Sequence, residues 1–269
     1  MKSKHTVFEN NKVSYLDMGK GSKTIVMLHG YLESKHIWHG FDVSLSDSYR
    51  VICIDLPGHG ESDVSYAYSL TVEKMAGAVK AVLRAEGIKS CFMIGHSLGG
   101  YVTLAFLEHY PAMLEGYCLL HSSPFADTLQ KRVMRDREIE LVIAGRQKLL
   151  FAINIPSGFA TDKLDEIPDL VSFAKDIAVS TKPDGVIAAL EAMKCRPDRQ
   201  NIMEESGKPL LVVLGKKDNY ISHDIMASVA AGVPDCTLLT LETSGHNGFL
   251  EDPKTLEAGI RSFLKGIGL

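Results

Sequence analysis

The segment best suited to chemistry is Gly95-His96-Ser97-Leu98-Gly99, which follows an apolar run and opens a helical pattern. A serine at such a strand-to-helix turn is held in a strained backbone conformation that exposes its hydroxyl group. Glycines on either side allow the two backbone segments to approach closely. The first amides of the helix that follows can receive an anion. The pentapeptide therefore predicts that Ser97 is a nucleophile.

A serine hydroxyl is a weak nucleophile, so it needs a nearby base and an acid that orients the base. Asp218 and His246 each follow an apolar run, and the carboxyl ends of parallel strands meet at one edge of a sheet. The order serine, aspartate, histidine is the one expected for a serine on this kind of turn. We therefore predict His246 as the base and Asp218 as its orienting acid. Asp224 and Asp252 are rival candidates for the acid.

The elements that must position these residues follow from the hydrophobic pattern. Apolar runs without polar alternation predict strands that are covered on both faces, and they occupy 25–28, 51–54, 91–94, 117–120, 210–214 and 236–241. Two shorter runs, 7–8 and 13–16, predict an opening hairpin. Helical spacing recurs in 71–87, 102–110 and 256–264. This order predicts an α/β fold with a mostly parallel eight-stranded sheet flanked by helices.

The alternation of strand and helix stops between residues 124 and 205. This segment is helical in pattern, with interleaved charges and interruptions at Pro156, Pro168 and Pro183. We predict a helical cap (124–205) inserted after the sixth strand, and an α/β core made of 1–123 and 206–269. The alternative is a pair of ordinary crossover helices with long loops, and long structureless loops are uncommon.

The motifs together resemble the α/β-hydrolase superfamily. They are His29-Gly30, the segment DLPGHGES at 55–62, GHSLGG at 95–100, GKKD at 215–218 and Gly245-His246. The resemblance implies Ser97 as nucleophile, His246 as base and Asp218 as the orienting acid. It also implies that the backbone N–H groups of Tyr31 and Leu98 form an oxyanion hole, and that 124–205 is the variable cap. It calls for no cofactor and no metal.

The predicted reaction is hydrolysis of a carboxylic ester or related acyl bond of a small molecule through an acyl-enzyme. Proteins with the same fold and triad also catalyse C–C bond hydrolysis, lyase reactions, acyl transfer and perhydrolysis, and a ligand-binding receptor with little turnover is a third possibility. A serine at position 97 argues against a dehalogenase, which would have aspartate there. His246 must be neutral to accept a proton, so activity should fall around pH ~6.5 unless its surroundings shift that value. The pattern does not fix the substrate.

Several other motifs favour structural roles. The loop 57–62 is glycine-rich, but Asp63 stands where a dinucleotide fingerprint needs its third glycine, so we interpret Asp55 and this loop as structural. His36 and His39 lack a third ligand for a metal. The segment 196–199 (RPDR) predicts a salt-linked junction where the cap rejoins the core, with a clamp for a substrate carboxylate as the alternative.

Composition excludes several classes of partner. The net charge of −4 argues against nucleic acid or an anionic membrane surface. The apolar runs are too short to span a bilayer, and the N-terminal residues lack the apolar stretch of a signal peptide. The cysteines are dispersed, and Cys53, Cys91 and Cys118 lie in apolar runs typical of buried thiols rather than disulfides. These features predict a soluble cytoplasmic protein with a small-molecule substrate, and they leave its oligomeric state open.

Overall fold

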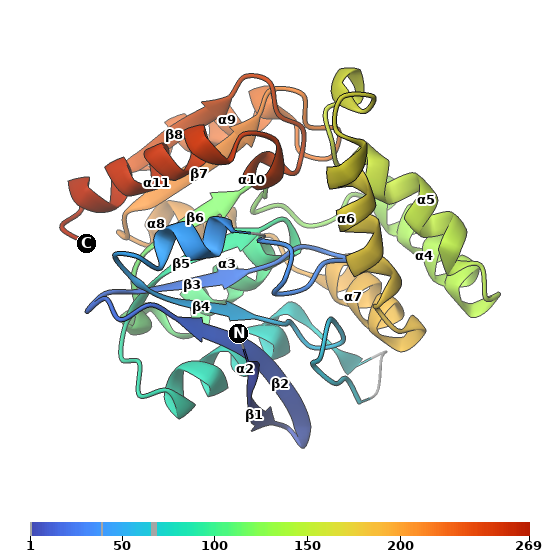
Figure 1. The fold of residues 1–269 in the computed structure, drawn as a ribbon, viewed down its shortest axis with the longest axis horizontal. Coiled ribbons are helices and arrows are strands. Elements are labelled where there is room, and N and C mark those ends of the chain that lie inside the picture. The colour runs from blue at the N-terminus through green and yellow to red at the C-terminus, as the bar shows by residue number, and fades with distance from the viewer. Residues whose placement is uncertain (1, 39, 66–68) are drawn as a thin grey trace.

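A central β-sheet organises the chain in the computed structural model, which describes residues 2–38, 40–65 and 69–269 (Figure 1). The eight-stranded sheet has the order β1-β2-β4-β3-β5-β6-β7-β8. β2 runs antiparallel to β1 and β4, and all other neighbours are parallel. The strands are β1 (Lys4–Phe8), β2 (Asn11–Met18), β3 (Thr24–Leu28), β4 (Arg50–Ile54), β5 (Cys91–His96), β6 (Leu114–Leu120), β7 (Leu210–Gly215) and β8 (Cys236–Leu241). The predicted mostly parallel sheet and its opening hairpin are confirmed.

Helices cover both faces of the sheet. They are α1 (Phe41–Leu45), α2 (Val72–Ala85), α3 (Leu98–His109), α4 (Leu129–Ile143), α5 (Gln147–Ser157), α6 (Pro168–Val179), α7 (Pro183–Cys195), α8 (Gln200–Glu205), α9 (His223–Ala231), α10 (Gly248–Glu251) and α11 (Pro253–Gly266). α2 packs against α3, whereas α1 packs against α11. The amphipathic helices α2 and α11 begin at polar caps: the Thr71 side chain accepts from the Lys74 N–H in α2, and the Asp252 side chain accepts from the Thr255 N–H in α11.

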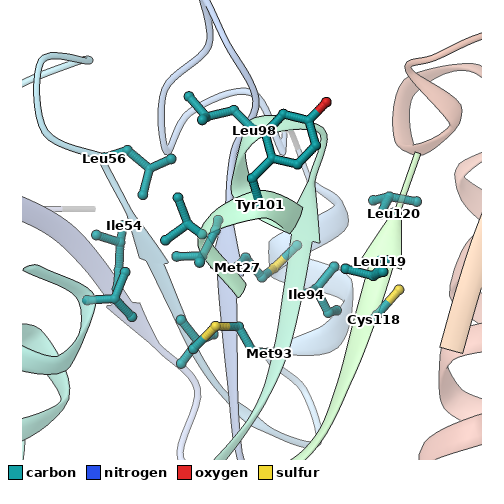
Figure 2. Close-up of a cluster of buried hydrophobic side chains, with 14 of the residues drawn as sticks. Met27, Ile54, Leu56, Met93, Ile94, Leu98, Tyr101, Cys118, Leu119 and Leu120 are labelled. Atoms are coloured by element: carbon teal, nitrogen blue, oxygen red, sulfur yellow. The ribbon is translucent and has the colours of Figure 1, made fainter. Parts of the chain in front are cut away.

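The apolar runs of the central strands build the core around the start of α3. Figure 2 shows side chains from β3, β4, β5 and β6, among them Met27, Ile54, Ile94 and Cys118, in one buried cluster with Leu98 of α3. All five of these residues are fully buried. Cys53 and Cys91 are also buried and free, as predicted for thiols in apolar runs. The core therefore holds the first turn of α3 firmly against the sheet.

Two predicted features differ in detail. β8 was expected to be covered on both faces, but it lies at the edge of the sheet, and Thr237 and Leu238 are exposed. An apolar run at an edge strand looks the same in sequence as one in the centre. The helix expected at 102–110 begins already at Leu98, because the serine turn leads directly into it. His39 lies outside the described residues, so the His36–His39 interpretation stays a prediction.

The chain between β6 and β7 is helical and carries α4 to α8. In Figure 1, α4, α5, α6 and α7 gather at one side of the molecule, beyond one end of the sheet. The predicted salt-linked junction forms at its return: Arg199 donates to Glu108 of α3 (2.9 Å) and to Glu73 of α2 (2.5 Å). Arg196 donates to Asp127 (2.7 Å) and is buried. No helix in the described part of the chain is long and apolar enough to cross a membrane.

Candidate active site

The backbone at Ser97 is strained and fixed between β5 and α3. Ser97 has φ 49° and ψ −112°, which few residues other than glycine adopt. Its N–H donates to the Leu120 carbonyl of β6 (3.0 Å). A Cβ at Gly95 would collide with the Gly99 carbonyl, and a Cβ at Gly99 would collide with the Leu28 carbonyl of β3. The two glycines are therefore needed because strand and helix approach too closely for a side chain, as the sequence predicts.

Asp218 and His246, predicted from loops 28 residues apart, are hydrogen-bonded to each other. His246 Nδ1 donates to Asp218 Oδ2 (2.8 Å), and the Asp218 side chain is 1% exposed. Asp218 Oδ1 accepts the N–H groups of Tyr220 (2.8 Å) and Ile221 (3.0 Å), which fix the carboxylate. The rival Asp224 has an 88% exposed side chain and contacts His223 instead. This geometry can hold the imidazole in one tautomer and orientation.

Charge in this pair favours a strong base. Burial alone would raise the pKa of Asp218, but His246 and His121 outweigh burial and lower it well below its usual range. Burial also works against a charged His246, but the Asp218 carboxylate prevails and raises the pKa of His246 above its ordinary value of 6.5. The acid therefore stays ionised while the base gains affinity for a proton.

Ser97 and His246 open into one cavity of about 350 Å³. Its walls come from the loop after β3, from the start of α3, from α4 to α7 and from the loops after β7 and β8. No hydrogen bond joins the Ser97 hydroxyl to the His246 ring among the described residues. Catalytic hydrogen bonds in unliganded sites are often long and tighten only with substrate bound. The structure thus brings the residues predicted as base and nucleophile to one cavity, without a hydrogen bond between their side chains among the described residues.

The two predicted oxyanion-hole residues lie beside this cavity. Leu98 is the first residue of α3, and Tyr31 follows Gly30 in the loop after β3. Within the described chain, neither the Leu98 nor the Tyr31 backbone N–H donates to a protein acceptor. The Tyr31 side chain lines the cavity, and its buried hydroxyl has no partner among the described residues. Both amides are therefore available to a ligand oxygen.

The loop that carries His246 is hydrogen-bonded to the chain at the end of α5. The His246 N–H donates to the Gly158 carbonyl at the end of α5 (2.9 Å). Glu251 of α10 accepts from Gly245 N–H and from Ala160 N–H, both at 2.9 Å. Burial raises the pKa of Glu251. One carboxylate thereby joins the loop of the base to the chain that follows α5.

Sequence reasoning missed a second histidine at the acid. His121 directly follows β6, is fully buried, and its Nδ1 lies 3.3 Å from Asp218 Oδ2. Burial lowers the pKa of His121 to about 4, so its ring is neutral near pH 7. Ligand atoms of His121, Asp218 and His246 lie within 4.8 Å of one another, close enough for a metal ion. His246 Nδ1 donates to Asp218, whereas His121 Nδ1 accepts from the Gly215 N–H (3.2 Å), which fixes the His121 ring beside the carboxylate.

A second pair of missed residues lies behind the nucleophile. His96 precedes Ser97, and its Nδ1 lies 3.0 Å from Glu33 Oε2. Glu33 stands in the loop after β3, three residues beyond Gly30, and lines the cavity. The motif contained His96, but its partner lies 63 residues away. Nothing in the local pattern of either residue indicates this contact.

The glycine-rich loop at 57–62 has the structural role that was predicted for it. Asp55 is fully buried; its Oδ2 accepts from Lys35 Nζ (2.6 Å) and from Glu61 N–H (2.9 Å). Its Oδ1 accepts from Lys35 N–H (2.7 Å). Ser62 donates to the Asp55 carbonyl (2.8 Å). A buried ion pair with these bonds anchors the loop and is satisfied without a ligand.

Comparison with known proteins agrees with this fold. The family described as alpha/beta hydrolase fold matches residues 23–140. The structure resembles a thermophilic esterase from Thermogutta terrifontis, with a TM-score of 0.93, 25% identity and coverage of 99% of both chains. The chain therefore has the α/β-hydrolase fold.

Relatives by sequence cover nearly the whole chain. A putative 2-succinyl-6-hydroxy-2,4-cyclohexadiene-1-carboxylate synthase of Bacillus subtilis is 27% identical over 97% of this chain and 98% of its own length. A 2-hydroxy-6-oxononadienedioate/2-hydroxy-6-oxononatrienedioate hydrolase of Pseudomonas putida is 26% identical over 94% of this chain and 92% of its own. Hydrolases are prominent among the relatives and similar structures, and this chain is an enzyme of the hydrolase class.

Proposed function

We propose that the protein is a serine hydrolase that cleaves a carboxylic ester or related acyl bond of a small molecule. The observation that carries this proposal is the 2.8 Å bond between Asp218 and His246, with His246 and Ser97 lining one cavity. The strained turn at Ser97 supports it, and so do the Tyr31 and Leu98 N–H groups, which have no acceptor within the described part of the chain.

In the proposed reaction His246 Nε2 takes the proton of the Ser97 hydroxyl as Oγ bonds to the acyl carbon. The carbonyl oxygen becomes an oxyanion, which the Tyr31 and Leu98 N–H groups stabilise. Each of these donors raises the rate by a factor on the order of 10²–10³. His246 then gives its proton to the departing alkoxide, leaving an acyl-enzyme and an alcohol. Water repeats the sequence, releasing the acid and restoring Ser97.

We propose further that residues 124–205 form a cap over the reacting groups, with 1–123 and 206–269 as the core. Residues of α4, α5, α6 and α7 line the cavity opposite Ser97. Among them are Met134, Ile155, Ala174 and Met193, which give that wall an apolar character. We therefore expect the acyl or alcohol part of the substrate to contact the cap, so that the cap sets substrate preference.

A second candidate keeps the triad for cleavage of a carbon–carbon bond. The relatives from Pseudomonas putida and Bacillus subtilis favour it, because their names describe chemistry on carbon skeletons. In that reaction the leaving group is a carbanion rather than an alkoxide, so it must be stabilised or protonated as it departs. The same Ser97 and His246 would serve in both cases.

A fluorophosphonate probe and a panel of esters with graded acyl chains test the proposal. The wild-type protein should be labelled and should hydrolyse at least one ester, whereas Ser97→Ala should do neither. Ser180→Ala changes an exposed serine that directly follows α6; it is the matched control and should behave as the wild type. Full turnover by Ser97→Ala would show that the nucleophile is wrong. Labelling without hydrolysis of any ester, together with cleavage of a diketone, would favour the second candidate.

A further inference from the structure

The donors and acceptors around His96 define its charge. Its Nε2 lies 2.9 Å from the backbone carbonyl of His246, and a carbonyl oxygen only accepts. Its Nδ1 lies 3.0 Å from Glu33 Oε2. If Glu33 is ionised, that oxygen also only accepts. Both ring nitrogens must then carry protons, which makes the ring an imidazolium.

Glu33 has the surroundings of an ionised carboxylate. Burial by itself would raise its pKa, but His96 and the Gly30 N–H outweigh burial and lower the pKa of Glu33. Gly30 N–H donates to the same oxygen, Oε2, at 2.5 Å. An oxygen that receives two donors is occupied as an acceptor. The pair is net neutral, which reduces the cost of burying its two charges.

Other groups packed around His96 supply no competing negative charge. The ring centroids of His246 and His121 lie 4.9 and 6.1 Å from that of His96. His29 interacts electrostatically with His96. Burial lowers the pKa of His29 and that of His121, so both rings are neutral near pH 7. Phe249 (4.9 Å) and Trp38 (6.4 Å) close the remaining sides edge-on. Glu33 is the carboxylate bonded to His96 in this cluster.

The same pair joins the three pieces of the reacting site. Glu33 holds the Gly30 N–H, and the next residue is Tyr31, a proposed oxyanion donor. His96 is bonded along the chain to Ser97 and holds the backbone of His246. A Cβ at Gly30 would lie 2.7 Å from His96 Nδ1 and 2.9 Å from Glu33 Oε2. Glycine at position 30 is what leaves room for this contact.

We propose that Glu33 and His96 are positioning residues: a buried carboxylate–imidazolium pair that fixes the oxyanion loop and the base loop relative to Ser97. The role in rate rests on the proposed serine hydrolase function, whereas the charge of the ring does not. A shift of about 1 Å in a positioned group can lower a rate about 10²-fold. Loss of the pair is therefore felt in kcat, because the oxyanion amide moves, rather than in KM.

The charge is tested on the wild-type protein by NMR with ¹⁵N-labelled histidine at pH 8, using His96→Gln to assign the signals. The expected result is a proton on both ring nitrogens of His96. A ring with a bare nitrogen would overturn the assignment. This measurement needs no activity, so it stands even if the protein is not a serine hydrolase.

The positioning role is tested with Glu33→Gln. The amide oxygen of glutamine is uncharged and a weaker acceptor for the Gly30 N–H and for a charged His96, so kcat for an ester should fall about 10- to 100-fold at nearly constant KM. Asp224→Asn removes another carboxylate–histidine contact, the exposed one to His223, and should leave kcat unchanged. If the wild type is labelled by fluorophosphonate and Glu33→Gln turns over at the wild-type rate, the positioning role is wrong. If the wild type itself is not labelled, the proposed function fails instead.

Discussion

The helices α3 and α4 line the same cavity but differ in almost every other respect. In α3 ten of twelve residues are buried, whereas in α4 two of fifteen are, namely Ile139 and Val142. α3 meets the sheet and places Ser97, and α4 presents Lys131, Met134, Arg135 and Glu138 to the cavity from outside. Under the proposed function the two helices have different tasks: the buried helix fixes the position of the nucleophile, and the exposed helix shapes the wall that a substrate would contact.

The difference has an energetic basis. A buried helix cannot shift without disturbing close-packed neighbours, so groups at its start keep their geometry. An exposed helix contributes little to the core, so its residues can change at small cost to folding. The buried helix thus keeps the geometry at Ser97 constant, whereas the exposed helix allows the wall of the same cavity to vary.

The largest effect on kcat should come from replacing Asp218, the proposed acid, in the buried part of the site. Asp218→Asn keeps the shape but no longer stabilises a protonated His246 or fixes its tautomer, so kcat should fall on the order of 10⁴-fold. Asp224→Asn, its rival by sequence, should show no effect beyond twofold or so. Ester hydrolysis by the two purified variants provides the measurement. Equal losses in both variants would contradict the triad.

Stability should divide along the same line. Leu104 of α3 is 1% exposed, so Leu104→Ala should lower the free energy of unfolding by about 2–5 kcal/mol. Leu129 of α4 is 81% exposed, and Leu129→Ala should change it by less than about 0.5 kcal/mol. Urea denaturation curves compare the two. Similar losses of unfolding free energy in the two variants would show that α3 and α4 contribute equally to stability.

The pH profile tests the charge of the base. His246 accepts a proton only when neutral, and Asp218 raises its pKa, so the acid limb of kcat/KM should lie above pH 6.5 and fall about tenfold per unit below it. Asp218→Asn removes the charge that raises the pKa, and its residual activity should show the limb at lower pH. A wild-type profile that is flat down to pH 5 would exclude His246 as the base.

The smallest effect should arise on the exposed side. Met134 lines the cavity from α4, so Met134→Ala should alter the relative kcat/KM for long and short acyl chains by several-fold, about 1 kcal/mol. Its neighbour Val133 is also partly exposed but does not line the cavity, and Val133→Ala should leave the preference unchanged. Identical acyl-chain profiles for Met134→Ala and wild type would remove α4 from the substrate site.

Much of the rigid side could be predicted from sequence. Strands buried on both faces require continuous apolar runs, so β3 to β7 are visible locally, and each predicted catalytic residue stands just after one of these runs or β8. The serine turn is visible because close backbone approach demands glycine at fixed positions. These are local constraints, and local constraints leave a local pattern.

The rest could not be predicted because it depends on contacts between distant segments. Glu33 and His96 meet across 63 residues, and His121 reaches Asp218 from a different strand. The sequence does not distinguish a buried charged residue from an exposed one, because burial depends on a partner that is distant along the chain. The helix ends in 124–205 were also unreadable, since mostly exposed helices such as α4 need no strict apolar stripe.

Glu251 connects the loop that carries His246 to the chain that follows α5. Its carboxylate accepts one amide beside His246 and one from Ala160, the residue that follows Phe159 after α5. The His246 amide itself is held by Gly158. Lifting this stretch of the cap would break two of these bonds, at roughly 0.5–1.5 kcal/mol each. An open cavity and a fixed His246 ring would then exclude each other. Closure over a bound ligand would restore the two hydrogen bonds together.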